Sequence, residues 1–362
     1  MNFRTTILLT VLTTLSMQAW GKDCSTTDIT LNTQQDVDSF QTIYGGGSTC
    51  DRVTGSLGIN GSGITDTSGL NKLTSIGADL FIVSNLTLTN IDGLSKITNI
   101  GADLFIQENT SLQNVDGFIG LTNLGGGLTV TNNAKLIHFN GLANLRTTGS
   151  GLFISGNPAL GSIDGLARLT GAPYLYIYGN TSLPNINGLG NITAVEAGLT
   201  ISANINLRNI DALTKLTSVG GGLHISENQV LADIDALARL TSIGGDLTIA
   251  ENDTLTNVDG FTRLTAVVGD IEISDNADLI SVAGLSTLTR ANDNLIIAGN
   301  ASLNNLNGMD RITKVLGGLY ITDNAMLADI GGLTNLTSVG EDIYLQNNHA
   351  LTSVDGLNQL AS

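Results

Sequence analysis

The side chains that could take part in catalysis recur at a regular spacing and do not converge on one site. Asp246 and Asp270 lie 24 residues apart, and carboxylates on adjacent coils of a repeat could form an acid–base pair. Repeated residues also form ladders that are purely structural. The three histidines are far apart, and no nucleophile elbow, phosphate-binding loop or metal motif occurs. We therefore expect a protein that is not an enzyme and that needs no cofactor or metal.

Aromatic side chains could bind a ligand. One position of a repeated pattern is Phe or Tyr in six of its twelve copies, although aromatic residues make up only 4% of the chain. Rigid rings on an exposed face bind sugars and peptides with little loss of entropy. Stacking between neighbouring strands is the alternative explanation. The candidate ligand-binding residues are Phe81, Phe105, Phe153, Tyr176, Tyr178, Tyr320 and Tyr344.

Carboxylates are expected on the same face in the second half of the chain. Such a patch could bind calcium or a basic partner, and a solvated acidic surface is the alternative. The candidate residues are Asp246, Glu251, Asp270, Glu272 and Asp275.

A repeat must position all of these residues. Twelve units run from Asn71 to Leu357, almost all of 24 residues, with one residue missing near Pro173 and a shorter unit in front. In each unit a segment such as "DLTI" alternates apolar and polar residues, which predicts a strand. One coil cannot bury its apolar residues alone, whereas stacked coils can. We expect a mainly β, right-handed solenoid of about 12–13 coils, with one parallel sheet and short helical turns on the opposite side.

Three polar columns accompany the apolar ones. An asparagine occurs in every unit from Asn85 to Asn348, which predicts a structural amide ladder. An acidic column including Asp235 precedes, by four residues, a basic column including Arg239; we interpret these as helix N-caps joined in local ion pairs. A threonine column is expected to stack within the wall, and ice binding is the alternative.

Composition and the N-terminus indicate an exported protein. The formal net charge of −17 argues against nucleic acid and anionic membranes as partners. Residues 1–21 resemble a signal peptide, with a basic start, a short apolar stretch and a small-x-small cleavage site. The only cysteines, Cys24 and Cys50, are expected to form a disulfide in an N-terminal cap, residues 22–54, ahead of the solenoid, residues 55–362. We expect a secreted or cell-surface protein without membrane insertion.

The pattern L-x-I-x-x-N-x-x-L-x-x-I-D-G-L-x-x-L-T-x-I-G-G resembles the leucine-rich-repeat superfamily, above all its receptor L-domain-like repeats. Internalin-type repeats are similar but shorter. The resemblance implies ligand binding or adhesion, with an extracellular protein or glycan as partner. A structural envelope or matrix component is the alternative. The last coil has no evident cap, so a homodimer through its open edge is possible.

Overall fold

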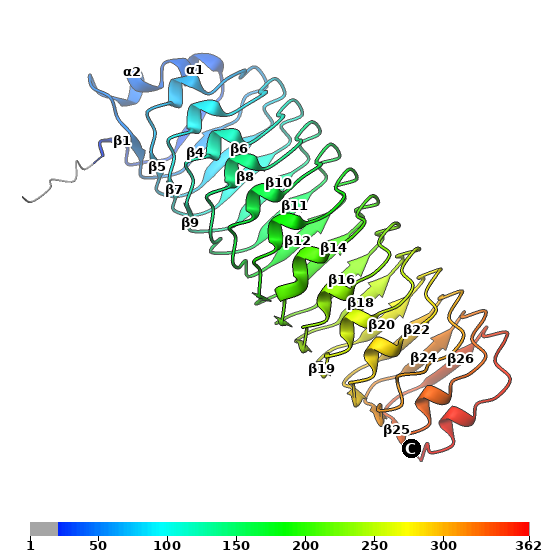
Figure 1. Cartoon of the computed structure of the whole chain (residues 1–362). Coiled ribbons are helices and arrows are strands. Elements are labelled where there is room, and N and C mark those ends of the chain that lie inside the picture. Colours follow the sequence, from blue (N-terminus) through cyan, green and yellow to red (C-terminus); the bar gives the residue numbers. More distant parts are fainter. Residues whose placement is uncertain (1–20, 362) are drawn as a thin grey trace, which may run out of the picture.

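The computed structural model describes residues 21–361. The predicted signal peptide therefore lies outside the described residues, except for Gly21. The described chain is an elongated stack of coils, in which each coil contacts the coil before and the coil after it (Figure 1).

A parallel sheet of 14 strands runs the length of the stack. All neighbouring strands pair in parallel, and equivalent residues of successive coils are partners. The predicted parallel solenoid is thus confirmed, with one strand, β2, added by the N-terminal segment. The strands in order are β2 (Ile29–Leu31), β4 (Leu57–Ile59), β6 (Leu80–Val83), β8 (Leu104–Gln107), β10 (Leu128–Thr131), β11 (Leu152–Ser155), β12 (Leu175–Tyr178), β14 (Leu199–Ser202), β16 (Leu223–Ser226), β18 (Leu247–Ala250), β20 (Ile271–Ser274), β22 (Leu295–Ala298), β24 (Leu319–Thr322) and β26 (Ile343–Gln346).

A second wall of the stack consists of short strands in three separate sheets. These strands follow the threonine column and precede the turn into the long sheet. The first sheet contains β1 (Asp23–Ser25), β3 (Arg52–Val53), β5 (Ser75–Ile76), β7 (Asn99–Ile100) and β9 (Asn123–Leu124). The second contains β13 (Ala194–Val195), β15 (Ser218–Val219), β17 (Ser242–Ile243) and β19 (Ala266–Val267), and the third β21 (Arg290–Ala291), β23 (Lys314–Val315) and β25 (Ser338–Val339).

Short helical turns form the remaining wall, as the sequence predicts. All are 3₁₀ helices, and all but η7 have three residues. They are η1 (Ser68–Leu70), η2 (Asp92–Leu94), η3 (Asp116–Phe118), η4 (Asn140–Leu142), η5 (Asp164–Leu166), η6 (Asn187–Leu189), η7 (Asp211–Lys215), η8 (Asp235–Leu237), η9 (Asp259–Phe261), η10 (Ala283–Leu285), η11 (Gly331–Leu333) and η12 (Asp355–Leu357).

The apolar columns form one continuous core. Leu240, Ile243 and Leu247, which represent three columns of one unit, are fully buried. The asparagine ladder lies in the same interior: every member from Asn85 to Asn324 has no exposed surface. From Asn109 on, each ladder amide accepts a hydrogen bond at Oδ1 from the preceding ladder residue, and each ladder Nδ2 donates to a strand carbonyl, so the buried ladder amides are satisfied.

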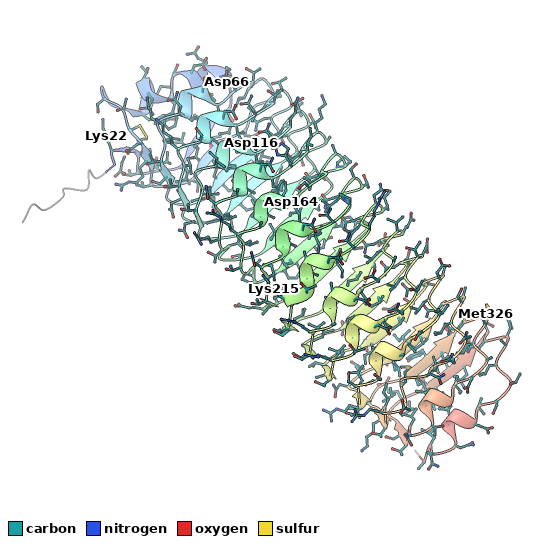
Figure 2. The ribbon with its side chains drawn as sticks, in the orientation of Figure 1. Lys22, Asp66, Asp116, Asp164, Lys215 and Met326 are labelled. Carbon is teal, nitrogen blue, oxygen red and sulfur yellow. A yellow bond between two sulfur atoms is a disulfide. The ribbon has the colours of Figure 1, made fainter. Side chains whose placement is uncertain are left out.

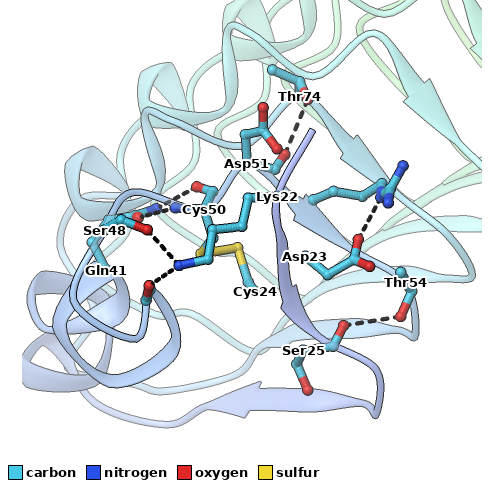
Figure 3. Close-up of a disulfide and its surroundings, with 12 residues drawn as sticks. Lys22, Asp23, Cys24, Ser25, Gln41, Ser48, Cys50, Asp51, Thr54 and Thr74 are labelled. Atoms are coloured by element: carbon cyan, nitrogen blue, oxygen red, sulfur yellow. Dashed lines mark hydrogen bonds and ion pairs between the residues drawn. A yellow bond between two sulfur atoms is a disulfide. The ribbon is translucent and has the colours of Figure 1, made fainter. Parts of the chain in front are cut away.

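The predicted disulfide is present in the N-terminal segment (Figure 3). Cys24 lies in β1 and Cys50 lies 26 residues later in the sequence. The Cα atoms of the two cysteines are 5.0 Å apart. Helices α1 (Gln34–Asp38) and α2 (Phe40–Tyr44) pack beside η1, at the end of the wall of helical turns. Gln41 holds the second cysteine in place, because its amide accepts from and donates to the backbone of Cys50.

Among residues 21–361, no helix is long and apolar enough to cross a membrane.

Candidate ligand-binding surfaces

The outward positions of the long sheet form its exposed face, which we call the strand face. In β8, Leu104 and Ile106 are fully buried, whereas Phe105 between them is only partly buried. This alternation holds from β6 to β24, because successive side chains of a strand point to opposite sides of the sheet. The aromatic residues of this column therefore do not belong to the core.

The predicted aromatic residues form three separate clusters along the strand face and not one continuous ladder. Phe81 and Phe105 stack with their ring centroids 5.0 Å apart and their planes nearly parallel. Tyr320 and Tyr344 stack in the same way at 5.2 Å. The remaining candidates lie in a central cluster, and Thr129 interrupts the column between the first cluster and the central one.

The central cluster consists of Phe153, Tyr174, Tyr176 and Tyr178. Their ring centroids lie 5.4 Å apart for Phe153 and Tyr174, and 5.8 Å apart for Tyr176 and Tyr178. The first three rings line an open depression of about 290 Å³. Burial among the other rings raises the pKa of the Tyr176 phenol above its usual value.

Tyr174 is a member that the sequence analysis did not select. The other eleven units have Asp, Asn or Gly at this position, two residues before the main aromatic column. The sequence feature that could have identified Tyr174 is the residue missing near Pro173, which shortens the turn into β12. This position coincides with the break between the short-strand sheet that ends at β9 and the sheet that starts at β13.

Glycines beneath the rings let them lie close to the backbone. A Cβ atom at Gly151 would come within 2.4 Å of the Phe153 ring, and one at Gly198 within 2.7 Å of the Tyr174 ring. Real Cβ contacts are essentially never this short, so a side chain at either position would force the neighbouring ring to move.

The predicted acidic residues occupy three places. Asp246 and Asp270 immediately precede strands of the long sheet, and each carboxylate accepts a hydrogen bond from the backbone of the next coil. The backbone N–H of Asp270 donates to the Asp246 carboxylate at 3.0 Å, and that of Asn294 donates to the Asp270 carboxylate at 2.9 Å. These carboxylates therefore satisfy the backbone of a turn. Glu272 lies within β20 and accepts from the Ser274 hydroxyl.

Glu251 and Asp275 lie instead in the turn after the strands. Both have a φ of 55°, in the left-handed region that is costly for residues other than glycine. With Glu227 and Asp253 they line an open groove of about 430 Å³, which we call the acidic edge. Within residues 21–361, no group of three or more His, Cys, Asp and Glu side chains is placed to hold a metal ion. Calcium binding at the predicted acidic residues thus gains no geometric support.

The threonine hydroxyls are occupied within the wall. Thr241 donates to the Thr217 carbonyl at 3.0 Å, and Thr265 donates to the Thr241 carbonyl at 3.1 Å. The same bond recurs along most of the column. Since these donors are used internally, the geometry favours wall stacking over an ordered array of free hydroxyls for ice.

The predicted N-caps and local ion pairs of the acidic column are wrong. Asp235 is the first residue of η8 and makes no side-chain cap; its own N–H donates to the Asp233 carboxylate. The only ion pairs among the described residues join Arg52 to Asp23 and His138 to Asp116. Side chains four residues apart meet on an α-helix, but η8 ends at Leu237, before Arg239.

No family model and no curated protein matches the chain. Solved structures with a similar fold include an internalin (inlF) from Listeria monocytogenes, with 22% sequence identity, a TM-score of 0.47, and coverage of 82% of this chain and 80% of that one. A TLR13–ssRNA13 complex has 14% identity, a TM-score of 0.22, and coverage of 84% and 58%. The leucine-rich-repeat ectodomain of the receptor kinase GASSHO1/SCHENGEN3 from Arabidopsis thaliana, in complex with CASPARIAN STRIP INTEGRITY FACTOR 2, has 14% identity, a TM-score of 0.22, and coverage of 82% and 46%. The 24-residue coils, long parallel sheet and 3₁₀ turns described above make this chain a parallel repeat solenoid.

Proposed function

We propose that this chain is a non-catalytic, extracellular recognition protein that binds a protein or glycan through its strand face. The observation that carries the proposal is the grouping of eight partly exposed aromatic rings into three clusters on one face. The Cys24–Cys50 disulfide supports an oxidising, extracellular location.

Packing alone gives a weaker explanation of the central cluster. A stacked pair contributes about 0.5–1.5 kcal/mol beyond its buried area, which accounts for two rings on neighbouring strands. It does not account for an open depression lined by Phe153, Tyr174 and Tyr176. A concave aromatic surface with hydroxyl groups at its rim suits a ligand that is apolar on one side and polar on the other.

The proposal is tested by binding of the purified protein to an array of extracellular-matrix proteins and glycans. Three paired variants localise any ligand: Phe81→Ser with Phe105→Ser, Phe153→Ser with Tyr176→Ser, and Tyr320→Ser with Tyr344→Ser. The matched control, His224→Ser with Thr248→Ser, alters the same column at two paired positions away from the aromatic clusters. Circular dichroism checks that each variant keeps its fold.

A saturable partner that is lost in at least one aromatic pair and kept in the control supports recognition by the strand face. If binding persists in all three pairs, the strand face is not the binding surface. An array without any partner favours the alternative, a structural envelope or matrix component.

The open edge of the last coil bears on self-association. Ile343 in β26 is 37% exposed and Val354 is 54% exposed, whereas the equivalent residues of earlier coils are buried. Homodimerisation through this edge stays a prediction. Sedimentation equilibrium of the wild type and of Ile343→Ser with Val354→Ser would show whether a dimer forms and depends on it.

A further inference from the structure

Six exposed cations lie in the short strands or three residues before them, and we call them the basic wall. They come from five consecutive coils and are Lys215, Arg239, Arg263, Arg290, Arg311 and Lys314. The corresponding segments, 214–221, 238–245, 262–269, 286–293 and 310–317, contain only two carboxylates, Asp293 and Asp310. Six cations against two anions give this wall a formal charge of +4 in a chain of −17. Figure 2 shows Lys215 on the side of the ribbon away from Met326.

None of these cations has a carboxylate partner, since neither ion pair among residues 21–361 involves them. Lys215 is held by the amide oxygen of Asn191 at 2.6 Å. The pKa of Asp235, four residues before Arg239, is raised by burial and then by Asp233 and Asp259, which places acids rather than cations around it. Asp235 therefore forms no ion pair with Arg239.

Like charges also face one another within the wall. Arg290 and Lys314 are direct partners in the parallel pair of β21 and β23. Like charges directly opposite on neighbouring strands destabilise a sheet. The fold thus accepts a repulsion that no ion pair among the described residues relieves.

Arg239 and Arg263 line an open groove of about 580 Å³ together with Thr217, Thr241 and Thr262. The Thr241 hydroxyl donates to a backbone carbonyl, so its oxygen still accepts hydrogen bonds from outside. Coils repeat at about 4.8 Å, so the five coils present their cations along roughly 20 Å. The wall therefore suits a linear ligand with regularly spaced negative charges.

We propose that the basic wall binds an acidic polysaccharide, a linear chain bearing sulfate or carboxylate groups. Guanidinium groups bind such anions through two parallel hydrogen bonds, and threonine oxygens can accept from sugar hydroxyls. Nucleic acid is the less suitable polyanion, because the five wall segments contain no aromatic residue on which a base could stack. The wall belongs to different sheets from the strand face, so this site goes beyond the function proposed above.

The test uses the full chain and heparin as the probe, with affinity measured over a range of salt concentrations. Arg239→Ser with Arg263→Ser removes the two cations of the groove. Lys135→Ser with Arg208→Ser is the matched control, because both residues are exposed cations outside the basic wall and the change in net charge is the same. Phe81→Ser with Phe105→Ser tests independence from the strand face.

We expect the wild type to bind heparin but not neutral dextran. The groove variant should lose affinity by about five- to thirtyfold, as for two exposed ionic contacts. For this variant, the slope of log K against the logarithm of the salt concentration should become less steep by roughly one to two. The cation control and the aromatic variant should both stay within twofold of the wild type, with unchanged circular dichroism.

Four results would overturn the proposal. The first is no binding of heparin at low salt, and the second is equal weakening in the groove variant and the cation control. The third is tighter binding of single-stranded polyuridylate than of heparin, which would identify nucleic acid as the occupant. Loss of heparin binding in the aromatic variant alone would place the site on the strand face, and would also refute the proposal.

Discussion

The asparagine ladder should make a single interior amide expensive to remove, and Asn228→Ala is the sharpest perturbation of it. The Asn228 amide lies at the centre of the stack with no exposed surface. Its Nδ2 donates to the carbonyls of Ile201 and Ser226, both at 2.9 Å, and also to Oδ1 of Asn252. Its own Oδ1 accepts from the backbone and the side chain of Asn204.

The magnitude follows from these contacts. Alanine would leave the Asn204 backbone N–H buried without its acceptor, at a cost of about 1–3 kcal/mol. The remaining lost hydrogen bonds contribute about 0.5–1.5 kcal/mol each, partly offset because the carbonyls keep other partners. We expect the free energy of unfolding to fall by about 2–5 kcal/mol.

Urea denaturation followed by circular dichroism measures this loss. Asn206→Ala is the matched control, because Asn206 is exposed and its amide donates a single bond, to the Thr181 carbonyl. The control should cost less than about 1 kcal/mol. Loss of the Asn228 amide from the middle of the ladder should also lower the cooperativity of unfolding, because each coil is stabilised only by its neighbours. An Asn228→Ala loss no larger than that of the control would refute the structural account of the ladder.

Three further perturbations probe other features. Replacing Cys24 and Cys50 by Ser should destabilise the N-terminal segment by on the order of 3 kcal/mol, and a proteolysis assay of that segment with the intact disulfide as control would measure it. Glu251→Val should destabilise by about 1–2 kcal/mol more than Glu251→Gly in urea denaturation, because φ is 55° there; equal effects would contradict the left-handed turn. The raised pKa of Asp235 means that its charged form disfavours folding, so the protein loses stability as pH rises from the usual aspartate pKa through the raised one. Asp235→Asn should therefore raise the melting temperature at pH 7 but not at pH 3. A lower melting temperature at pH 7 would refute the repulsion between Asp235 and its acidic neighbours.

The fold was predictable because its determinants are local and repeated. Columns such as those of Leu240 and Leu247 specify which side of each coil faces inward, and twelve copies of the same pattern leave little ambiguity. The asparagine ladder and the disulfide were predictable for the same reason: one column has no exceptions, and only two cysteines exist.

The surfaces were less predictable because they depend on geometry between coils. The position of Tyr174 beside Phe153 results from one missing residue, whose effect on a turn cannot be read from the residue types. The ion pair expected between Asp235 and Arg239 assumed a turn of 3.6 residues, whereas the three-residue 3₁₀ helix ends before it can form. That difference leaves Arg239 and Arg263 without the expected partners.

The most direct test of the central claim is calorimetric titration of the ligand that the array identifies into the wild type and each of the three aromatic pairs, Phe153→Ser with Tyr176→Ser among them. The account predicts a negative heat-capacity change for the wild type, from burial of the aromatic rings, and at least about tenfold weaker binding by the aromatic variant that localises the ligand. The same affinity in the wild type and in all three aromatic pairs would contradict recognition through the strand face.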